Sequence, residues 1–174
     1  FQLATHLRGL GFMVTVVADQ RSPGREDIDF DATLNIKVQR IRLYYFRVLM
    51  YLQRCLVVFK MIRQQDLVIA TGKFPLWLVG FYRLFFKRKS LAVIHGSEVN
   101  LKQRHLRWLT DWSLKRFHQV IAVSRYTQSL VAHLDLKAVT VIPNAINSND
   151  WTLNTDITFE VKGSPKLLTV GRLS

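Results

Sequence analysis

The sequence predicts an α/β fold, in which a parallel sheet has helices on both faces. Short runs of consecutive apolar residues, such as 90–95 and 119–123, alternate along the chain with longer segments of helical periodicity. Strands that are apolar on both sides are typical of parallel sheets, because both of their faces are buried. Small or polar residues follow these runs, and open α/β sheets bind ligands at that edge, beyond the carboxyl ends of the strands.

The first half of the chain alternates between helix and strand, with one long loop. Leucines recur at helical spacing over residues 3–10, and Gly11 after them is a typical helix end. Residues 19–34 contain proline, glycine and five acids, which favours a loop. The predicted elements are a helix ending near 11, a strand at 12–18, a loop at 19–34, a strand at 36–41, a helix at about 44–65 and a strand at 66–71.

The second half repeats the pattern with shorter loops. Pro75 is placed to begin a helix, because proline lacks the amide hydrogen that the first turn leaves unbonded. The apolar run that Gly96 ends is predicted to be a strand buried on both faces. The predicted elements are a helix from 75 to about 87, a strand at 90–95, a helix at about 103–117, a strand at 119–123, a helix at 124–134 and a strand at 139–142.

We expect one domain, a linker and the beginning of a second domain. The 174 residues suffice to bury the core of one ordinary α/β domain. Beyond residue 146 the chain becomes polar and loses clear periodicity, until a new apolar run starts at 166. The expected divisions are a domain at 1–146, a linker at 147–165 and the first strand of a truncated domain at 166–174.

Composition excludes several classes of protein. An apolar content of 49% excludes a disordered chain, and the longest charge-free apolar stretch, 74–82, is too short to span a bilayer. The single cysteine, Cys55, is predicted to be a buried apolar residue, and its isolation fits a reducing cytoplasm. The five histidines lack metal-ligand spacing, and no glycine-rich nucleotide-binding motif is present. We therefore expect no metal and no cofactor.

The net charge of +13 indicates an anionic partner or location. From residue 32 to 97 the only acid is Asp66, against twelve bases, and aromatic residues lie among those bases. A cationic surface attracts anionic lipids, phosphorylated substrates and nucleic acid alike, but aromatic and cationic side chains together favour a membrane surface. The alternative is an ordinary helix packed on the core, with a solvated basic face.

The candidate catalytic residues are His95 and Glu98, which follow a predicted strand. A neutral imidazole at His95 can donate a hydrogen bond to a sugar hydroxyl, or it can simply cap the strand end. Glu98 can accept hydrogen bonds from hydroxyls, or favour the start of a following helix. The residues that follow strands and are expected to line a ligand cleft are Gly72, Gly96, Ser124 and Asn144.

Ser124 and Arg172 admit two interpretations each. Ser124 can N-cap the helix that follows it, and we favour that role over nucleophilic catalysis because no G-x-S-x-G motif surrounds it. Arg172 follows Gly171 at the end of the last strand and can bind a diphosphate, since a guanidinium is permanently charged and bidentate. Taken alone, Arg172 would be a solvated surface residue.

The order of these strand ends resembles glycosyltransferase family 4, the bacterial group 1 transferases of GT-B fold. The resemblance covers nearly the whole chain and rests on I-H-G-S-E at 94–98, A-V-S-R at 122–125, V-I-P-N-A at 141–145 and L-T-V-G-R-L-S at 168–174. It implies a retaining transferase, with a Rossmann-like amino-terminal domain that binds the acceptor and a carboxyl-terminal domain that grips a nucleotide-sugar.

The resemblance also implies roles for individual residues. His95 would face the transferred sugar near the leaving phosphate, and Glu98 matches a frequent acidic position. Arg172 would contact the donor diphosphate, and Gly171 would let the backbone approach it.

Departures from the family pattern limit what this chain is expected to do. Phe12 stands where a histidine is common, and Ala145 replaces a glycine. The first strand and its glycine-rich loop would precede Phe1, and the donor-site lysine and paired glutamates would follow Ser174. We therefore expect an interruption in the sheet, and no transfer by these residues alone.

The expected function is a hexosyltransferase reaction in cell-envelope polysaccharide biosynthesis. The partners would be a nucleotide-sugar donor, a glycan or lipid-linked acceptor and an anionic membrane surface at the cytoplasmic face, but not nucleic acid. Three alternatives stay open: a sugar-nucleotide epimerase of the same fold, a basic nucleic-acid-binding module, and a binding-only fragment. The sequence leaves open the donor, the acceptor, the linkage and the oligomeric state.

Overall fold

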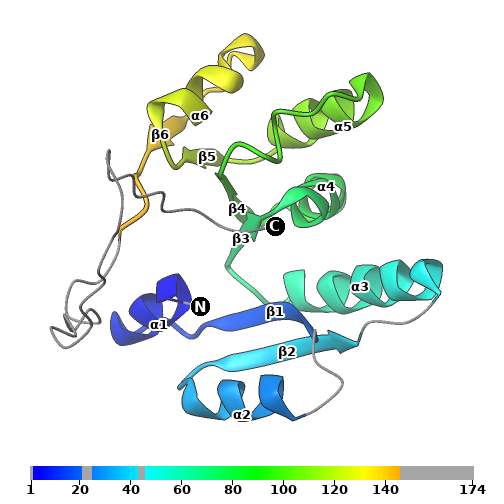
Figure 1. Cartoon of the computed structure of the whole chain (residues 1–174), viewed down its shortest axis with the longest axis vertical. Helices are drawn as coiled ribbons and strands as arrows, with labels where there is room; N and C mark the ends of the chain where they lie inside the picture. Colours follow the sequence, from blue (N-terminus) through cyan, green and yellow to red (C-terminus); the bar gives the residue numbers. More distant parts are fainter. Residues whose placement is uncertain (1, 21–24, 43–45, 146–174) are drawn as a thin grey trace, which may run out of the picture. The chain divides into compact units, whose positions relative to one another are not determined.

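The structure, a computed structural model, describes residues 2–20, 25–42 and 46–145, except for the side chain of Arg47. Its helices and strands alternate along the chain (Figure 1). They are α1 (Gln2–Gly9), β1 (Thr15–Gln20), α2 (Glu26–Thr33), β2 (Lys37–Arg42), α3 (Arg47–Ile62), β3 (Leu67–Thr71), α4 (Lys73–Tyr82), β4 (Lys89–Ile94), α5 (Arg104–Leu114), β5 (Gln119–Ala122), α6 (Arg125–Leu130), the 3-10 turn η1 (Ala132–Leu134) and β6 (Val139–Val141).

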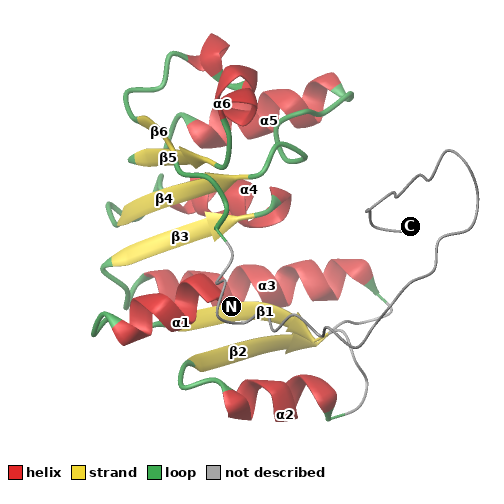
Figure 2. Ribbon diagram, turned by 60° about the vertical axis from the view of Figure 1, so that its left-hand side comes forward, coloured by secondary structure: helices red, strands yellow, loops and turns green. Residues whose placement is uncertain are grey.

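Every strand pairing in the described residues is parallel, and helices lie on both faces of the strands (Figure 2). In the order β3-β4-β5-β6, Val93 of β4 lies between Thr71 of β3 and Ile121 of β5. The predicted α/β fold with a Rossmann-like parallel sheet is thereby confirmed. These elements belong to one compact unit, Phe1–Pro143, while Asn144–Ser174 form a second unit.

The described strands form two sheets, β1-β2 and β3-β4-β5-β6, instead of one. Figures 1 and 2 both show β1 between β2 and β3, yet β1 pairs only with β2 in the described part of the chain. An interruption of this kind was expected from the sequence. The strand that would fill it stays a prediction.

The best-packed core lies around β4 and β5. Leu76 of α4, Ile94 of β4 and Leu114 of α5 are completely buried there. The axes of α4 and α5 are held close by a glycine, because a Cβ at Gly80 would lie 2.7 Å from the Cβ of Ser113. The indole N–H of Trp77 also donates to the Thr110 hydroxyl at 2.8 Å.

Helix α3 contacts elements from both sheets. The Tyr82 hydroxyl of α4 donates to the Cys55 carbonyl at 2.6 Å, and burial of that phenol raises the pKa of Tyr82 to about 12. The preceding residue, Arg54, pairs through its guanidinium with Asp19 of β1 at 2.7 Å. Cys55 is half-buried and packs against the core, close to its predicted role.

Strand β2 is tied to α2 by an arginine–carboxylate pair. Arg40 donates from Nε and Nη2 to the two carboxylate oxygens of Asp31, at 2.8 and 2.6 Å. Its Nη1 donates to the Asp19 carbonyl at 2.9 Å. This bidentate contact raises the pKa of the Arg40 guanidinium, against the opposing effect of burial.

The predicted loop at 19–34 is wrong, because Glu26–Thr33 form α2. Glu26, Asp27 and Asp29 lie in its first turn, where negative side chains interact favourably with the amide groups of a helix start. In the sequence, the same acids close to Pro23 favour a polar loop.

Several predicted boundaries also differ from the structure. Helix α4 begins at Lys73, so Pro75 lies in its first turn and does not start it. Strand β1 begins at Thr15, three residues later than predicted. The helix predicted at 124–134 ends at Leu130 and continues as a separate 3-10 turn. Among the described helices, none is long and apolar enough to cross a bilayer.

Candidate functional site

The carboxyl ends of β3 to β6 lie at one edge of the larger sheet, because these strands are parallel and paired in register. Pairing continues just past the ends, since the Val123 amide donates to the Ile94 carbonyl at 3.2 Å and the Ile142 amide to the Ala122 carbonyl at 3.0 Å. The residues that follow the strands are therefore held at this edge. They include the predicted residues Gly72, His95, Gly96 and Ser124, whereas Asn144 belongs to the second unit.

A turn after β4 presents His95. His95 is exposed, whereas Glu98, three positions later, is only 6% exposed. One carboxylate oxygen of Glu98, Oε2, accepts the backbone amide of His95 at 3.1 Å. Glu98 thus folds back beneath the turn and fixes the backbone from which His95 projects.

Gly96 takes a backbone conformation that other residues rarely adopt. Its φ is +111°, and a Cβ there would lie 3.6 Å from Oγ1 of Thr127. The Gly96 carbonyl accepts the amides of Val99 at 3.2 Å and Asn100 at 2.9 Å, which closes the turn. Gly96 is therefore needed for the shape of the turn that carries His95.

The predicted N-cap at Ser124 is confirmed. Its hydroxyl oxygen accepts the Thr127 amide at 3.0 Å, at the start of α6. The two hydroxyl oxygens, Oγ of Ser124 and Oγ1 of Thr127, also lie 3.0 Å apart. Thr127 is 2% exposed and is a support of the edge that the sequence analysis missed, although its position three residues after a cap was a usable signal.

Gly72 follows β3, and Asn144 is the first residue of the second unit. Gly72 is the N-cap of α4 with a φ of +87°, so it allows the sharp change from β3 into the helix. Asn144 is exposed and follows Pro143 just after β6, as expected for a strand end. Gly171 and Arg172 lie outside the described residues, so their predicted contact with a donor stays a prediction.

A histidine with a shifted pKa lies at the opposite edge of the sheet. Nδ1 of His118 accepts the amide of Ser90, near the start of β4, at 3.0 Å. Desolvation lowers the pKa of His118, and the positive charges of Arg83 and Lys89 lower it further. Because it lies at the amino ends of the strands, His118 belongs to the scaffold and not to the candidate site.

Chemically, the edge offers one exposed imidazole, that of His95, on a turn whose glycine, Gly96, is itself buried. An imidazole can both donate and accept hydrogen bonds, which suits a polyhydroxylated ligand. Within the described residues no three His, Cys, Asp or Glu side chains come together as a cation site would require.

The chain was compared with models of protein families. A family model described as Glycosyltransferase Family 4 matches residues 1–150. None of the curated proteins compared with the chain matches it. The matched range includes the candidate edge, from Gly72 to Ser124, and also Asn144.

Proposed function

The chain belongs to glycosyltransferase family 4, and we propose that it supplies the acceptor side of a retaining hexosyltransferase. The donor is a nucleotide-sugar, and the acceptor is a glycan or lipid-linked sugar of the cell envelope, reached at the cytoplasmic face of a membrane. The observation that carries the proposal is the exposed His95 on a turn held by Glu98, at the edge where an α/β sheet binds ligands.

In the proposed reaction an acceptor hydroxyl bonds to the anomeric carbon of the donor sugar. The bond from that carbon to the nucleoside diphosphate breaks, and the acceptor proton passes to the departing diphosphate. His95 hydrogen-bonds the transferred sugar and holds its anomeric carbon toward the acceptor, on the face from which the diphosphate departs, as retention requires. Arg172, with Gly171 beside it, neutralises the charge that develops on the diphosphate, so the step needs no metal or cofactor.

In this proposal Glu98 does not contact the substrate but positions His95. Its carboxylate holds the backbone amide of His95 and is 6% exposed, so it is a positioning residue. Transfer would require a donor-binding domain that includes Arg172 and continues beyond Ser174.

The test is made in the protein that carries this chain together with that domain. His95→Ala should lower kcat by about 10²- to 10³-fold, the usual loss when one transition-state hydrogen-bond donor is removed. His105→Ala, which removes an exposed histidine on α5, is the matched control and should leave kcat unchanged. Urea unfolding should show equal stability for both variants.

The assay follows nucleoside diphosphate release and the glycosylated product, with and without acceptor. Unchanged kcat in His95→Ala would remove His95 from the site. Conversion of the donor to an epimer without acceptor would replace the transferase by the epimerase alternative. Glu98→Gln tests positioning: it should lower kcat less than His95→Ala and leave KM for the donor unchanged.

A further inference from the structure

We propose that α3 and the end of α4 form a surface that docks on an anionic lipid bilayer. The inference deepens the proposed function, on which its link to a lipid-linked acceptor rests, but bilayer binding itself needs neither donor nor acceptor. We name these residues the α3–α4 surface. Its apolar members are Val48, Leu49, Leu52, Leu56, Phe59, Phe81, Leu84 and Phe85, and its cationic members are Lys60, Arg63, Lys87 and Arg88.

Helix α3 is apolar on the side that faces water. Leu49, Leu52 and Leu56 recur at spacings of three and four residues and are 55%, 55% and 70% exposed. The opposite side of the helix already contributes to the interior, where Met50 and Ile62 are buried. A surface helix of a globular protein normally carries polar residues outward, so this outward row calls for a covering partner.

The charged residue in the middle of α3 points inward instead. The Arg54 side chain is 14% exposed and pairs with Asp19 at 2.7 Å. Among the side chains of α3 described between residues 48 and 59, the outward row is therefore apolar and not basic, and the exposed Lys60 follows it.

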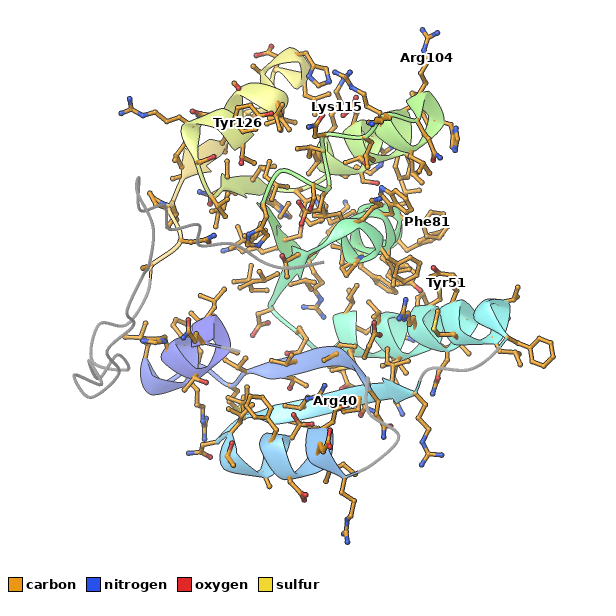
Figure 3. The ribbon with its side chains drawn as sticks, in the orientation of Figure 1. Arg40, Tyr51, Phe81, Arg104, Lys115 and Tyr126 are labelled. Atoms are coloured by element: carbon orange, nitrogen blue, oxygen red, sulfur yellow. The ribbon has the colours of Figure 1, made fainter. Side chains whose placement is uncertain are left out.

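Exposed aromatic residues of α4 continue this surface. The Phe59 ring lies 5.4 Å from the Tyr82 ring and 5.1 Å from the Phe86 ring, which joins the end of α3 to the end of α4. Phe81 and Phe85, 46% and 63% exposed, pack on each other at 5.4 Å. Figure 3 shows the labelled Tyr51 of α3 and Phe81 of α4 on the same side of the strands.

Exposed cations lie where the two helices end. Lys60 and Arg63 are at the end of α3, and Lys87 and Arg88 follow α4. Arg88 donates to the Arg63 carbonyl at 2.8 Å, so the two groups of cations adjoin. Asp66 is the only acid between residues 32 and 97.

This combination fits a bilayer better than a protein or a nucleic acid. Exposed phenylalanines can stack on nucleobases, but the leucine row of α3 offers a nucleic acid neither charge nor hydrogen bonds. A bilayer offers an apolar layer directly below anionic headgroups, which suits both the leucines and the cations. A second copy of this chain would bring two cationic groups together, which is unfavourable. The α3–α4 surface matches both layers of an anionic bilayer at once.

The experiment measures co-sedimentation of the chain with vesicles of phosphatidylcholine alone or mixed with phosphatidylglycerol. We expect binding to the anionic vesicles that weakens with salt. Leu52→Ser with Leu56→Ser should lower the partition coefficient at least about tenfold, since two large apolar side chains no longer enter the bilayer. The matched control is Leu3→Ser with Leu10→Ser, which removes two leucines that are 57% and 75% exposed elsewhere.

The charged part of the surface is tested separately. Lys60→Gln with Lys87→Gln should lower anionic-vesicle binding by about fivefold per charge and leave phosphatidylcholine binding unchanged. Lys37→Gln with Lys137→Gln, two exposed lysines outside the surface, should have a smaller effect.

Three outcomes would overturn the proposal. The first is equal vesicle binding by the Leu52/Leu56 and Leu3/Leu10 variants. The second is a dimer in solution that the Leu52/Leu56 variant loses, which would make the surface a protein interface. The third is equal affinity for mixed-sequence DNA and anionic vesicles at the same salt. Circular dichroism and urea unfolding establish that each variant is folded, and none of these readouts depends on sugar transfer.

Discussion

Replacing Gly80 by alanine tests how closely α4 and α5 must pack. The added Cβ would lie 2.7 Å from the Cβ and 2.9 Å from the Cα of Ser113. Non-bonded carbon atoms prefer separations of about 3.5–4.0 Å, so the helices must move apart by roughly 1 Å. The closest atoms belong to or adjoin the backbone, and no side-chain rotation can relieve the contact.

The magnitude follows from two opposing effects. Overpacking of a well-packed core costs about 1–3 kcal/mol, and Leu76 and Leu114, completely buried on these same helices, leave little room for adjustment. Exchanging glycine for alanine inside a helix contributes about 1 kcal/mol in the other direction. Because the contacts at 2.7 and 2.9 Å involve the Cβ and Cα of Ser113, we place the overpacking cost in the upper part of that range, at about 2–3 kcal/mol. After the opposing effect of about 1 kcal/mol, Gly80→Ala should lower the free energy of unfolding by about 1–2 kcal/mol.

Urea unfolding followed by circular dichroism measures this difference. The control is Gly9→Ala at the end of α1, where a Cβ would meet nothing within 4 Å, so stability should stay equal or rise slightly. Combining Gly80→Ala with Ser113→Gly removes one of the clashing atoms, and the double variant should be more stable than the sum of the two single losses predicts. Gly80→Ala as stable as Gly9→Ala would refute the close approach of the two helices.

Three further predictions concern the scaffold. Because the folded chain holds the pKa of His118 below the usual value of about 6.5, the unfolded chain takes up this proton first as the pH falls, so stability is lost below about pH 6.5. His118→Asn keeps an acceptor for the Ser90 amide and should flatten this part of a pH series of urea midpoints. Ser124→Ala removes the cap of the Thr127 amide and should cost about 1 kcal/mol in unfolding free energy, measured by urea unfolding. Arg40→Met leaves a half-buried carboxylate unpaired and should destabilise the chain more than Arg40→Lys does, by thermal unfolding.

The parallel sheet was predictable because its strands carry a strong local signal. Residues 89–94 and 119–122 are strands within one residue of the predicted ranges. Apolar runs of this length between helical segments are too short for a helix and are typical of buried strands. Helix α2 was not predictable in the same way. Its acids stabilise a helix start only if a helix forms, and the same residues beside Pro23 are equally typical of a loop.

The candidate edge was predictable as a set of positions but not as a set of contacts. His95, Gly96 and Ser124 follow strands, and parallel pairing alone brings strand ends to one edge. The inward position of the Glu98 carboxylate depends on the turn at Gly96, whose φ of +111° the strand pattern does not predict. A carboxylate at that position could equally have faced a ligand.

The outward face of α3 could not be predicted from amino-acid composition alone. The twelve bases between residues 32 and 97 suggested a cationic helix surface. The structure pairs Arg54 with Asp19 and turns leucines outward, because helix phase decides which side chains meet water.

The position of α3 has a consequence for how the chain unfolds. Since the two sheets share no ladder among the described strands, their cooperativity must pass through side chains, and α3 offers the bond from Tyr82 to Cys55 and the pair between Arg54 and Asp19. Loosening that helix would let β1 and β2 open as a unit of their own while β3 to β6 stay closed. A ligand or surface that binds α3 and restricts its motion would then suppress this separate opening. It would slow hydrogen exchange in β1 and β2 without contacting either strand.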